Sequence, residues 1–255
     1  MSDINPYDYI PQPSVGVLYD PPARPHVDLA GTTAVVIDAI RATTTIVSAL
    51  AAGATEVVPY LTDEDVHAEA ARRPAGSVVT CGERLGERIE GLDLNNSPPL
   101  MTPEAVGGRS LLLTTTNGTR AILAARPADT VLVAAFANRT AVARQVAEAG
   151  RRTVLLSAGT VGTVSCEDTL VAGACIEALA DAEGGEGFHL EDSAQVALMA
   201  WQAGRDRLEA ILRETWGGAF ILGLGLDDDL AACGRVDTTD VVPEVRGDPP
   251  VIRAG

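Results

Sequence analysis

In two segments of the sequence, a strand-like run is followed by a polar turn and then by a helix-like run that opens with Arg-Ala. They read IDAIRATTT at residues 37–45 and TTTNGTRA at residues 114–121. Free N–H groups and the dipole at the start of a helix favour an anion placed above the strand end. The alternative is a pair of ordinary capped helices, one of them beside a Thr-rich strand. We predict an anion-binding site in which Arg41 and Arg120 are catalytic residues. Its substrate-binding residues are Thr115, Thr116, Asn117, Gly118 and Thr119.

Acidic side chains accompany these turns at positions where they could hold a metal ion. Asp38 stands at the expected carboxyl end of a buried strand, where open α/β sheets place their ligands. Glu167 and Asp168 open an expected helix, and carboxylate oxygens suit a hard cation such as Mg²⁺. The alternatives are N-cap and first-turn acids that only stabilise their helices. We predict a metal site made by Asp38, Glu167 and Asp168, with Asp38 and Asp168 also catalytic.

The long segment from Cys81 to Thr102 is rich in Gly, Glu, Arg, Asn and Pro. Loops of this length inside a compact domain are usually functional or disordered, and the mixed charge here favours an ordered, functional loop. The segment gathers carboxylate, guanidinium, amide and hydroxyl groups, all of which can contact an anionic ligand or the groups around it. Its candidates are Glu83 and Arg84 as catalytic residues, and Asn96 and Ser97 as substrate-binding residues.

The composition excludes several classes of protein. The chain has 255 residues, 35 of them acidic and 19 basic, and its net charge of −16 argues against nucleic acid or an anionic membrane as a partner. Every basic residue is Arg, so the chain has neither the Schiff-base lysine of pyridoxal phosphate enzymes nor the lysine of a P-loop. None of the four Cys begins the Cys-x₅-Arg loop that a cysteine phosphatase needs, and the three His are scattered.

Strand-like and helix-like runs alternate along most of the chain. The strand-like runs lie at 35–37, 55–60, 77–80, 110–115, 130–135 and 153–157, and the helix-like runs at 42–51, 63–73, 119–125, 139–149 and 167–182. This alternation predicts an α/β fold with a largely parallel sheet and helices on both faces. If the likeness between the two Arg-Ala segments reflects a repeat, two similar α/β halves share one cleft. We divide the chain into an N-terminal arm at 1–32, a catalytic core at 33–183 and a C-terminal helical segment at 188–255 that packs on the core.

Five segments, taken in order, resemble the 2-phosphosulfolactate phosphatase family: DAIRATTT, GERLGERIEGLDLNNSP, TTTNGTRA, FANRTAVA and SAGTVGTVSCEDTLVAG. The resemblance is strong over about residues 33–180. It implies an α/β enzyme that uses Mg²⁺ to release phosphate from 2-phospho-3-sulfolactate, on the way to coenzyme M. Asn138, in FANRTAVA, is a further substrate-binding candidate. Whether Asp38 or a metal-bound water attacks phosphorus stays open.

We therefore expect a Mg²⁺-dependent phosphatase of a small, multiply anionic phosphate ester, with a homodimer left open. The expected compartment is the cytoplasm, because MSDINPYDYIPQPS lacks a basic region followed by an apolar run. Three alternatives remain. One is a non-catalytic anion-binding protein, and another is a phosphatase of the same type with another phosphoester substrate. The third is a different enzyme with a similar anion pocket, such as a phosphate-ester lyase or a nucleotide hydrolase. A nucleotide hydrolase should show an aromatic clamp for the base, and only Phe136 lies beside these motifs.

Overall fold

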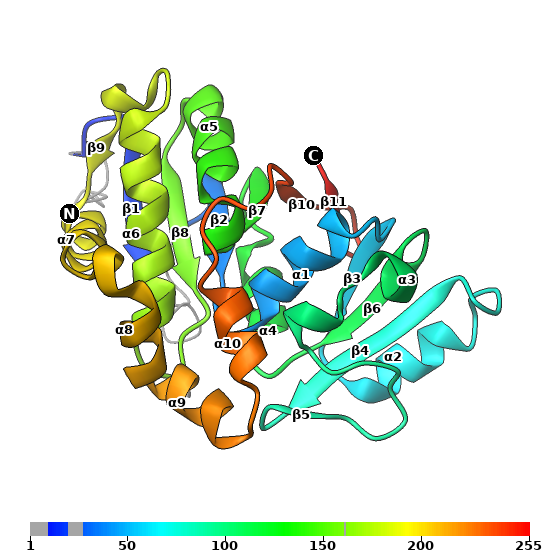
Figure 1. Cartoon of the computed structure of the whole chain (residues 1–255). Helices are drawn as coiled ribbons and strands as arrows, with labels where there is room; N and C mark the ends of the chain where they lie inside the picture. The colour runs from blue at the N-terminus through cyan, green and yellow to red at the C-terminus, as the bar shows by residue number, and fades with distance from the viewer. Residues whose placement is uncertain (1–9, 20–27, 161) are drawn as a thin grey trace.

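The computed structural model describes residues 10–19, 28–160 and 162–255, and these form an α/β fold around one mixed sheet (Figure 1). In the described residues the sheet has eleven strands in the order β5-β4-β6-β3-β11-β10-β7-β2-β8-β1-β9. The α/β class predicted from the alternating pattern is confirmed. The strands are β1 (Ser14–Leu18), β2 (Thr33–Ile37), β3 (Glu56–Tyr60), β4 (Val78–Arg84), β5 (Glu87–Arg88), β6 (Ser110–Thr114), β7 (Thr130–Ala134), β8 (Thr153–Ser157), β9 (His189–Leu190), β10 (Pro243–Arg246) and β11 (Val251–Ala254).

The sheet contains two groups of parallel strands joined by an antiparallel hairpin. One group is β7-β2-β8-β1-β9, and the other is β4-β6-β3. Strand β10 pairs antiparallel with β7, and β11 pairs antiparallel with both β10 and β3. The two groups therefore run in opposite directions, which agrees with the expectation of two α/β halves.

Helices cover both faces of the sheet, and strand β2 shows why. Its side chains alternate between the faces, as they do in any strand. Val35 and Ile37 pack in one apolar cluster with side chains of α5 and α6, whereas Ala34 and Val36 pack in a second cluster with side chains of α1 and α4. Both faces are buried, so the strand is a continuous apolar run. The helices are α1 (Ala42–Ala51), α2 (Asp63–Ala70), α3 (Pro103–Val106), α4 (Gly118–Ala125), α5 (Arg139–Ala149), α6 (Cys166–Asp181), α7 (Asp192–Gly204), α8 (Leu208–Glu214), α9 (Trp216–Gly223) and α10 (Asp227–Cys233).

The structure corrects the roles that we expected of the two ends of the chain. Within the predicted arm, Ser14–Leu18 is a fully buried strand between β8 and β9, so this part is not peripheral; residues 1–9 and 20–27 lie outside the described residues. The C-terminal segment contributes not only α7 to α10 but also β9, β10 and β11. Because β10 and β11 lie between the two strand groups, this segment is part of the sheet and not only a helical layer upon it.

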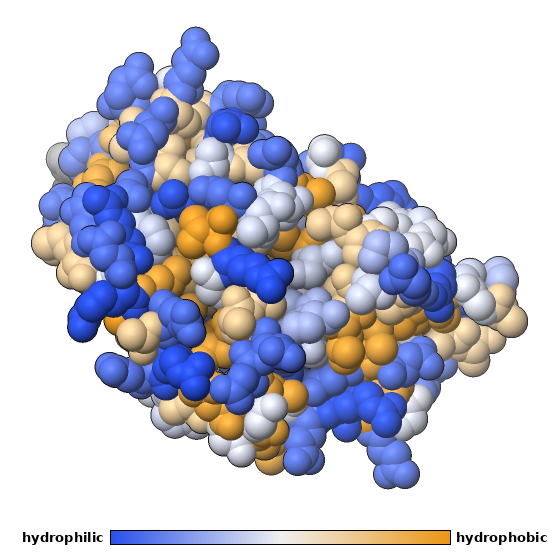
Figure 2. All heavy atoms as spheres, viewed as in Figure 1, coloured by the Kyte–Doolittle hydropathy of each residue, from blue (hydrophilic) through white to orange (hydrophobic). Residues whose placement is uncertain are grey.

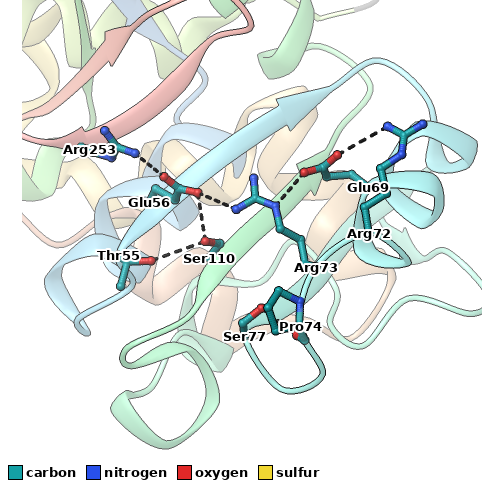
Figure 3. A network of polar contacts seen from close by, with 9 residues as sticks. All are labelled: Thr55, Glu56, Glu69, Arg72, Arg73, Pro74, Ser77, Ser110 and Arg253. Carbon is teal, nitrogen blue, oxygen red and sulfur yellow. Dashed lines mark hydrogen bonds and ion pairs between the residues drawn. The ribbon is translucent and has the colours of Figure 1, made fainter.

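A network of ion pairs attaches the last strand to the second strand group (Figure 3). Glu56 of β3 is buried, and its carboxylate accepts hydrogen bonds from Arg253 of β11 at 2.6 Å and from Ser110 of β6 at 3.0 Å. Arg73 also lies 3.3 Å from Glu56 and bonds Glu69 at 2.6 Å. Only one residue pair, Ile252 with Val57, joins β11 to β3 in register. The Glu56 carboxylate therefore reinforces a junction that has little backbone pairing.

On the face shown in Figure 2, hydrophobic residues lie in small groups among hydrophilic ones. In the part of the chain that the structure describes, no helix combines the length and the apolar character required to span a bilayer.

Candidate active site

A cavity of about 370 Å³ lies at the carboxyl ends of β2, β4, β6 and β8, next to α9. The turns that follow strands of both groups line it, although the groups run in opposite directions through the sheet. Nine of the residues predicted from the sequence line this cavity: Asp38, Arg41, Glu83, Asn96, Thr115, Thr116, Asn117, Glu167 and Asp168. The cavity is therefore the place where the separate motifs of the sequence meet.

The two Arg-Ala turns face each other across this site. A Cβ atom on Gly118, the first residue of α4, would lie 2.4 Å from the Cβ of Ala42 and 2.8 Å from Oδ2 of Asp38. Carbon atoms that are not bonded cannot approach so closely, so this position requires glycine. The close approach brings the start of α4 against Asp38, and both turns line one cleft, as the internal likeness predicted.

Asp38 and Asp168 form a pair of neighbouring buried carboxyl groups. The Asp168 carboxylate accepts hydrogen bonds from the N–H of Ala39 at 2.8 Å and of Gly159 at 3.2 Å, while Asp38 accepts one from the N–H of Ala42 at 3.3 Å. Burial raises the pKa of Asp38 to about 7, and the charges of Glu83 and Glu167 add to the rise. Burial and the charge of Asp38 raise the pKa of Asp168 well above its usual value. Two carboxyl groups placed in this way favour a shared proton or a bound cation.

Glu83 and Glu167 also line the cavity, and neighbouring residues fix their positions. Oε1 of Glu83 accepts the N–H of Thr116 at 2.8 Å, and Oε2 accepts the N–H of Gly86 at 3.0 Å. Glu83 thus joins the turn after β4 to the turn after β6, and it takes an N–H group that we had expected to bind an anion. Glu167 is buried against Gly217, where a Cβ would lie 2.1 Å from its Oε1, and burial raises its pKa.

Arg41 supplies a guanidinium to the cavity, and its orientation is fixed by Asp229. The two side chains form a buried ion pair, and Nη2 of Arg41 also donates to the carbonyl oxygen of Gly86 at 2.8 Å. The second oxygen of Asp229 accepts the hydroxyl of Ser97 at 2.6 Å. Asp229 lies on α10, far from these residues in the sequence. One carboxylate therefore positions two of the predicted site residues.

The cavity lining contains more acidic than basic side chains. Four carboxyl groups line it, whereas Arg41 is its one guanidinium among the described residues, and that group is already paired with Asp229. Three of the acids have raised pKa values because of burial. An anionic ligand would meet repulsion here unless a cation or protons accompanied it.

The other predicted residues lie outside the cavity lining. Arg84 is exposed and approaches Asp63 at 3.8 Å, and Arg120 is exposed on α4. Gly118 and Thr119 build the turn, where the Thr119 hydroxyl donates to the carbonyl oxygen of Thr115 at 2.8 Å. The Asn138 side chain is fully buried and bonds the backbone of Ala135, Val133 and Val241. The structure therefore gives Asn138 a structural role, and it places the predicted catalytic residues Arg84 and Arg120 outside the lining.

Three residues of this region could not be recognised from the sequence. Trp216 and Phe220 of α9 line the cavity, with their rings stacked at 5.4 Å. Their spacing of four residues puts both on one face of a helix, but it does not say what that face meets. Asp229 belongs to the run Asp227–Asp229, which in the sequence indicates only the start of a helix. The scarcity of aromatic residues beside the motifs does not exclude a nucleotide ligand, because α9 brings two aromatic rings to the cavity.

Among the described residues, no three or more His, Cys, Asp and Glu side chains form a group arranged to hold a metal ion. Asp38, Glu167 and Asp168 share the cavity but are not a ready set of three ligands. The cysteines do not supply a nucleophile to this cavity, since burial raises the pKa of the Cys81 thiol to about 12 and Cys166 is not part of the lining.

Comparison with known proteins identifies the family. The family model described as 2-phosphosulpholactate phosphatase matches residues 20–248. A protein of Synechococcus sp. (strain CC9605) is 40% identical over 235 residues, which is 91% of this chain and 96% of the relative. A protein of Symbiobacterium thermophilum is 40% identical over 223 residues, 88% of this chain and 94% of the relative. Both are described as "Probable 2-phosphosulfolactate phosphatase". The chain therefore belongs to the 2-phosphosulfolactate phosphatase family.

Proposed function

We propose that the protein is a phosphoric monoester hydrolase that converts 2-phospho-3-sulfolactate and water into 3-sulfolactate and phosphate, with Mg²⁺ as its cofactor. The family and the descriptions of the relatives support this reaction and this substrate. The cavity at the strand ends supports a site for a small ligand, since it has the size and the convergent polar groups of one. We place the reaction in the synthesis of coenzyme M and the protein in the cytoplasm.

The observation that carries the Mg²⁺ proposal is the excess of carboxyl groups in the cavity. The substrate carries a phosphate, a sulfonate and a carboxylate, so it would bring several negative charges to four acids and one guanidinium. Opposite charge must come from elsewhere, because like charges within a few ångströms repel strongly in a partly desolvated site. A divalent cation supplies it.

The carboxyl pair Asp38 and Asp168 fits Mg²⁺. This ion often takes one or two protein carboxylates and completes its shell with water and substrate phosphate oxygens, so a set of three protein acids is not required. The carboxylate oxygens are hard donors, and burial raises the pKa of both groups although the charge of Arg41 lowers that of Asp38. When bound, Mg²⁺ would offset charge and polarise the phosphoryl group.

The protein's own residues would position the phosphate ester. The Arg41 guanidinium, held by Asp229, is a planar donor that can bind two phosphoryl oxygens. The start of α4 would attract the remaining negative charge through its dipole, and Thr116 and Asn117 border the same space. Asp38 lies against the first residue of α4, where a Cβ on Gly118 would be 2.8 Å from its Oδ2, and it would serve either as nucleophile or as the base that takes a proton from water.

Phosphate release from 2-phosphosulfolactate, measured with Mg²⁺ and with excess chelator, tests the proposal. We expect turnover with Mg²⁺, its loss in chelator and its return on addition of Mg²⁺. Asp38→Asn should lower kcat by about a hundredfold or more, the scale for a general base or nucleophile. Binding of the ester without any turnover would show the non-catalytic anion-binding protein instead, and full activity in chelator would remove Mg²⁺ from the proposal.

A further inference from the structure

A second cavity, of about 430 Å³, lies outside the candidate active site and shares no lining residue with it. It is formed where α1 and α10 meet the short helix η3 (Pro98–Leu100) and the chain at Ala137 and Thr238. Helices α1 and α10 lie side by side in Figure 1, and Thr44 of α1 is hydrogen-bonded to Cys233 of α10. A volume of this size is typical of sites for small molecules, so the cavity has room for a ligand of its own.

Two side chains of opposite charge border this second cavity, and both are available to a ligand. Asp228 and Arg235 are exposed, and among the residues that the structure describes neither forms an ion pair. Asp227 and Asp229, on either side of Asp228, both pair with arginine side chains. A guanidinium can bind a carboxylate through two parallel hydrogen bonds, and a carboxylate can accept hydrogen bonds from an ammonium group. The cavity therefore offers one binding group to each charge of a zwitterion.

The lining between these charged groups is partly apolar. Pro98, Met101 and Ala137 are buried residues that border the cavity, and Ala231 of α10 adds a methyl group. Apolar surface of this kind gains free energy when an aliphatic group covers it and removes it from water. A ligand with a short aliphatic side chain beside its two charges would therefore use the whole lining.

The walls of the second cavity are held in place without a ligand. Ser97, directly before η3, donates its hydroxyl to the carboxylate of Asp229 on α10 at 2.6 Å. Thr44 joins α1 to α10 through Cys233, as described above, and also donates its hydroxyl to the carbonyl oxygen of Ala39 at 2.8 Å. Because these bonds fix all three elements, a ligand would not have to order the walls when it binds, which lowers the free-energy cost of binding.

We propose that the second cavity binds a free α-amino acid with an apolar side chain, whose carboxylate pairs with Arg235 and whose ammonium group pairs with Asp228. The aliphatic side chain would lie against Pro98 and Met101. A ligand with several negative charges suits the cavity less, because Asp228 repels it, and a ligand with only positive charge is repelled by Arg235. The site is separate from the candidate active site, so the proposal does not depend on the proposed function.

Three matched compounds test the proposal by isothermal titration calorimetry with the full chain. L-leucine carries both charges, 4-methylpentanoate lacks the ammonium group and 3-methylbutylamine lacks the carboxylate, while all three have the same aliphatic group. We expect L-leucine to bind with a Kd of about 1 mM or lower, and each analogue to bind at least about tenfold more weakly, the scale of one charge-assisted hydrogen bond. Absence of L-leucine binding, or equal affinity for all three compounds, overturns the proposal.

Two pairs of variants locate the ligand. Arg235→Ala and Asp228→Asn should each raise the Kd of L-leucine by about tenfold, for the same reason. Their controls are Arg207→Ala and Asp227→Asn, which change exposed residues outside the lining and should leave the Kd at the wild-type value. Circular dichroism checks that each variant is folded, as we expect because all four residues are exposed. An unchanged Kd in both Arg235→Ala and Asp228→Asn places the ligand elsewhere and overturns the proposal.

Discussion

The substitution Asp229→Asn tests whether a distant helix positions the guanidinium of the site. The side chains of Arg41 and Asp229 are only 2% and 4% exposed, so the substitution leaves a buried positive charge without its partner. Breaking a buried ion pair from one side costs about 3–5 kcal/mol. At about 2–4 °C per kcal/mol for a chain of this size, we expect the Tm to fall by roughly 6–20 °C. Because the Asn side chain keeps the shape of Asp, the loss is one of charge and not of packing.

The same substitution should reduce activity, because Arg41 lines the cavity and Ser97 loses its charged acceptor. Loss of one charge-assisted contact to the substrate costs about 1.5–3 kcal/mol, which is roughly ten- to hundredfold in kcat/KM. The assays are thermal unfolding followed by circular dichroism, and phosphate release under steady-state conditions. Asp227→Asn is the matched control on the same helix. Asp227 is 61% exposed and pairs with Arg213 at 3.3 Å, so its loss should cost less than about 1 kcal/mol.

A double variant separates the structural role of the pair from its role in the site. Arg41→Met with Asp229→Leu replaces both charges by apolar side chains, which often restores the stability that a single substitution loses. We expect Tm to recover while kcat/KM stays low, because the guanidinium is absent. Identical Tm and kcat/KM in Asp229→Asn and Asp227→Asn would refute the reasoning, and recovery of activity in the double variant would remove Arg41 from substrate binding.

Three further predictions follow from other parts of the structure. Burial raises the pKa of Asp38 from 3.8 to about 7, so between these pH values the folded state binds more protons than the unfolded state. The free energy of unfolding therefore falls as the pH rises through this range, by at most about 4 kcal/mol at about 1.4 kcal/mol per pKa unit. Urea unfolding in chelator from pH 4 to 8 should show a larger loss of stability in the wild type than in Asp38→Asn, in which Asp168 and Glu167 still have raised pKa values. Mg²⁺ should diminish the wild-type loss at pH 8, and parallel curves for the two proteins would contradict the claim. Gly118→Ala should destabilise the fold by about 1–3 kcal/mol and lower kcat, because its Cβ would overlap Ala42 and Asp38, whereas Gly187→Ala, which meets open space, should not lower kcat. Burial tends to raise the pKa of Glu56, but hydrogen bonds from Arg253 and Ser110 and the charges of Arg253 and Arg73 outweigh burial, so the pKa is lowered. This carboxylate therefore stabilises the fold above its unfolded pKa of about 4.5, and the stabilisation is lost as the pH falls. Glu56→Gln should destabilise the protein at pH 7 and only slightly at pH 3, and equal losses of stability at both pH values would contradict this.

The fold could be predicted where the signal is local. Val35, Val36 and Ile37 read as a buried strand because both faces of β2 are covered, and the helix that follows was predicted at the observed bounds, Ala42–Ala51. The hairpin of β10 and β11 could not be predicted in this way. Its strands have four residues each, and they carry Glu244, Arg246 and Arg253 among the apolar residues. Their place between the two strand groups depends on partners that are distant in the sequence, Leu132 and Val57.

The candidate site was predictable to the extent that its residues follow strands. Asp38 and Thr115 come directly after strand ends, where a parallel sheet places its ligands, and both line the cavity. Arg120 also comes shortly after a strand end, but it lies exposed on α4. The rotation of the helix about its axis determines which residue of that turn reaches the site. Asp229 and Trp216 come from the C-terminal helices, whose packing against the strand ends is a tertiary contact that no spacing in the sequence encodes.

The absence of Lys and the acidity of the cavity are both consistent with an anion that is bound by Arg together with a cation. A buried guanidinium stays charged and presents donors in a fixed plane, so Arg41 can bond Asp229 and the carbonyl oxygen of Gly86 at the same time, as a single ammonium group could not with the same geometry. Those bonds also use part of its capacity, and Glu83 takes the N–H of Thr116. The protein's own donors are thus partly committed before any ligand arrives. For a substrate with several negative charges, we expect the remaining attraction to come mainly from the cation that we propose at Asp38 and Asp168, so metal removal should abolish turnover more completely than any single Arg substitution.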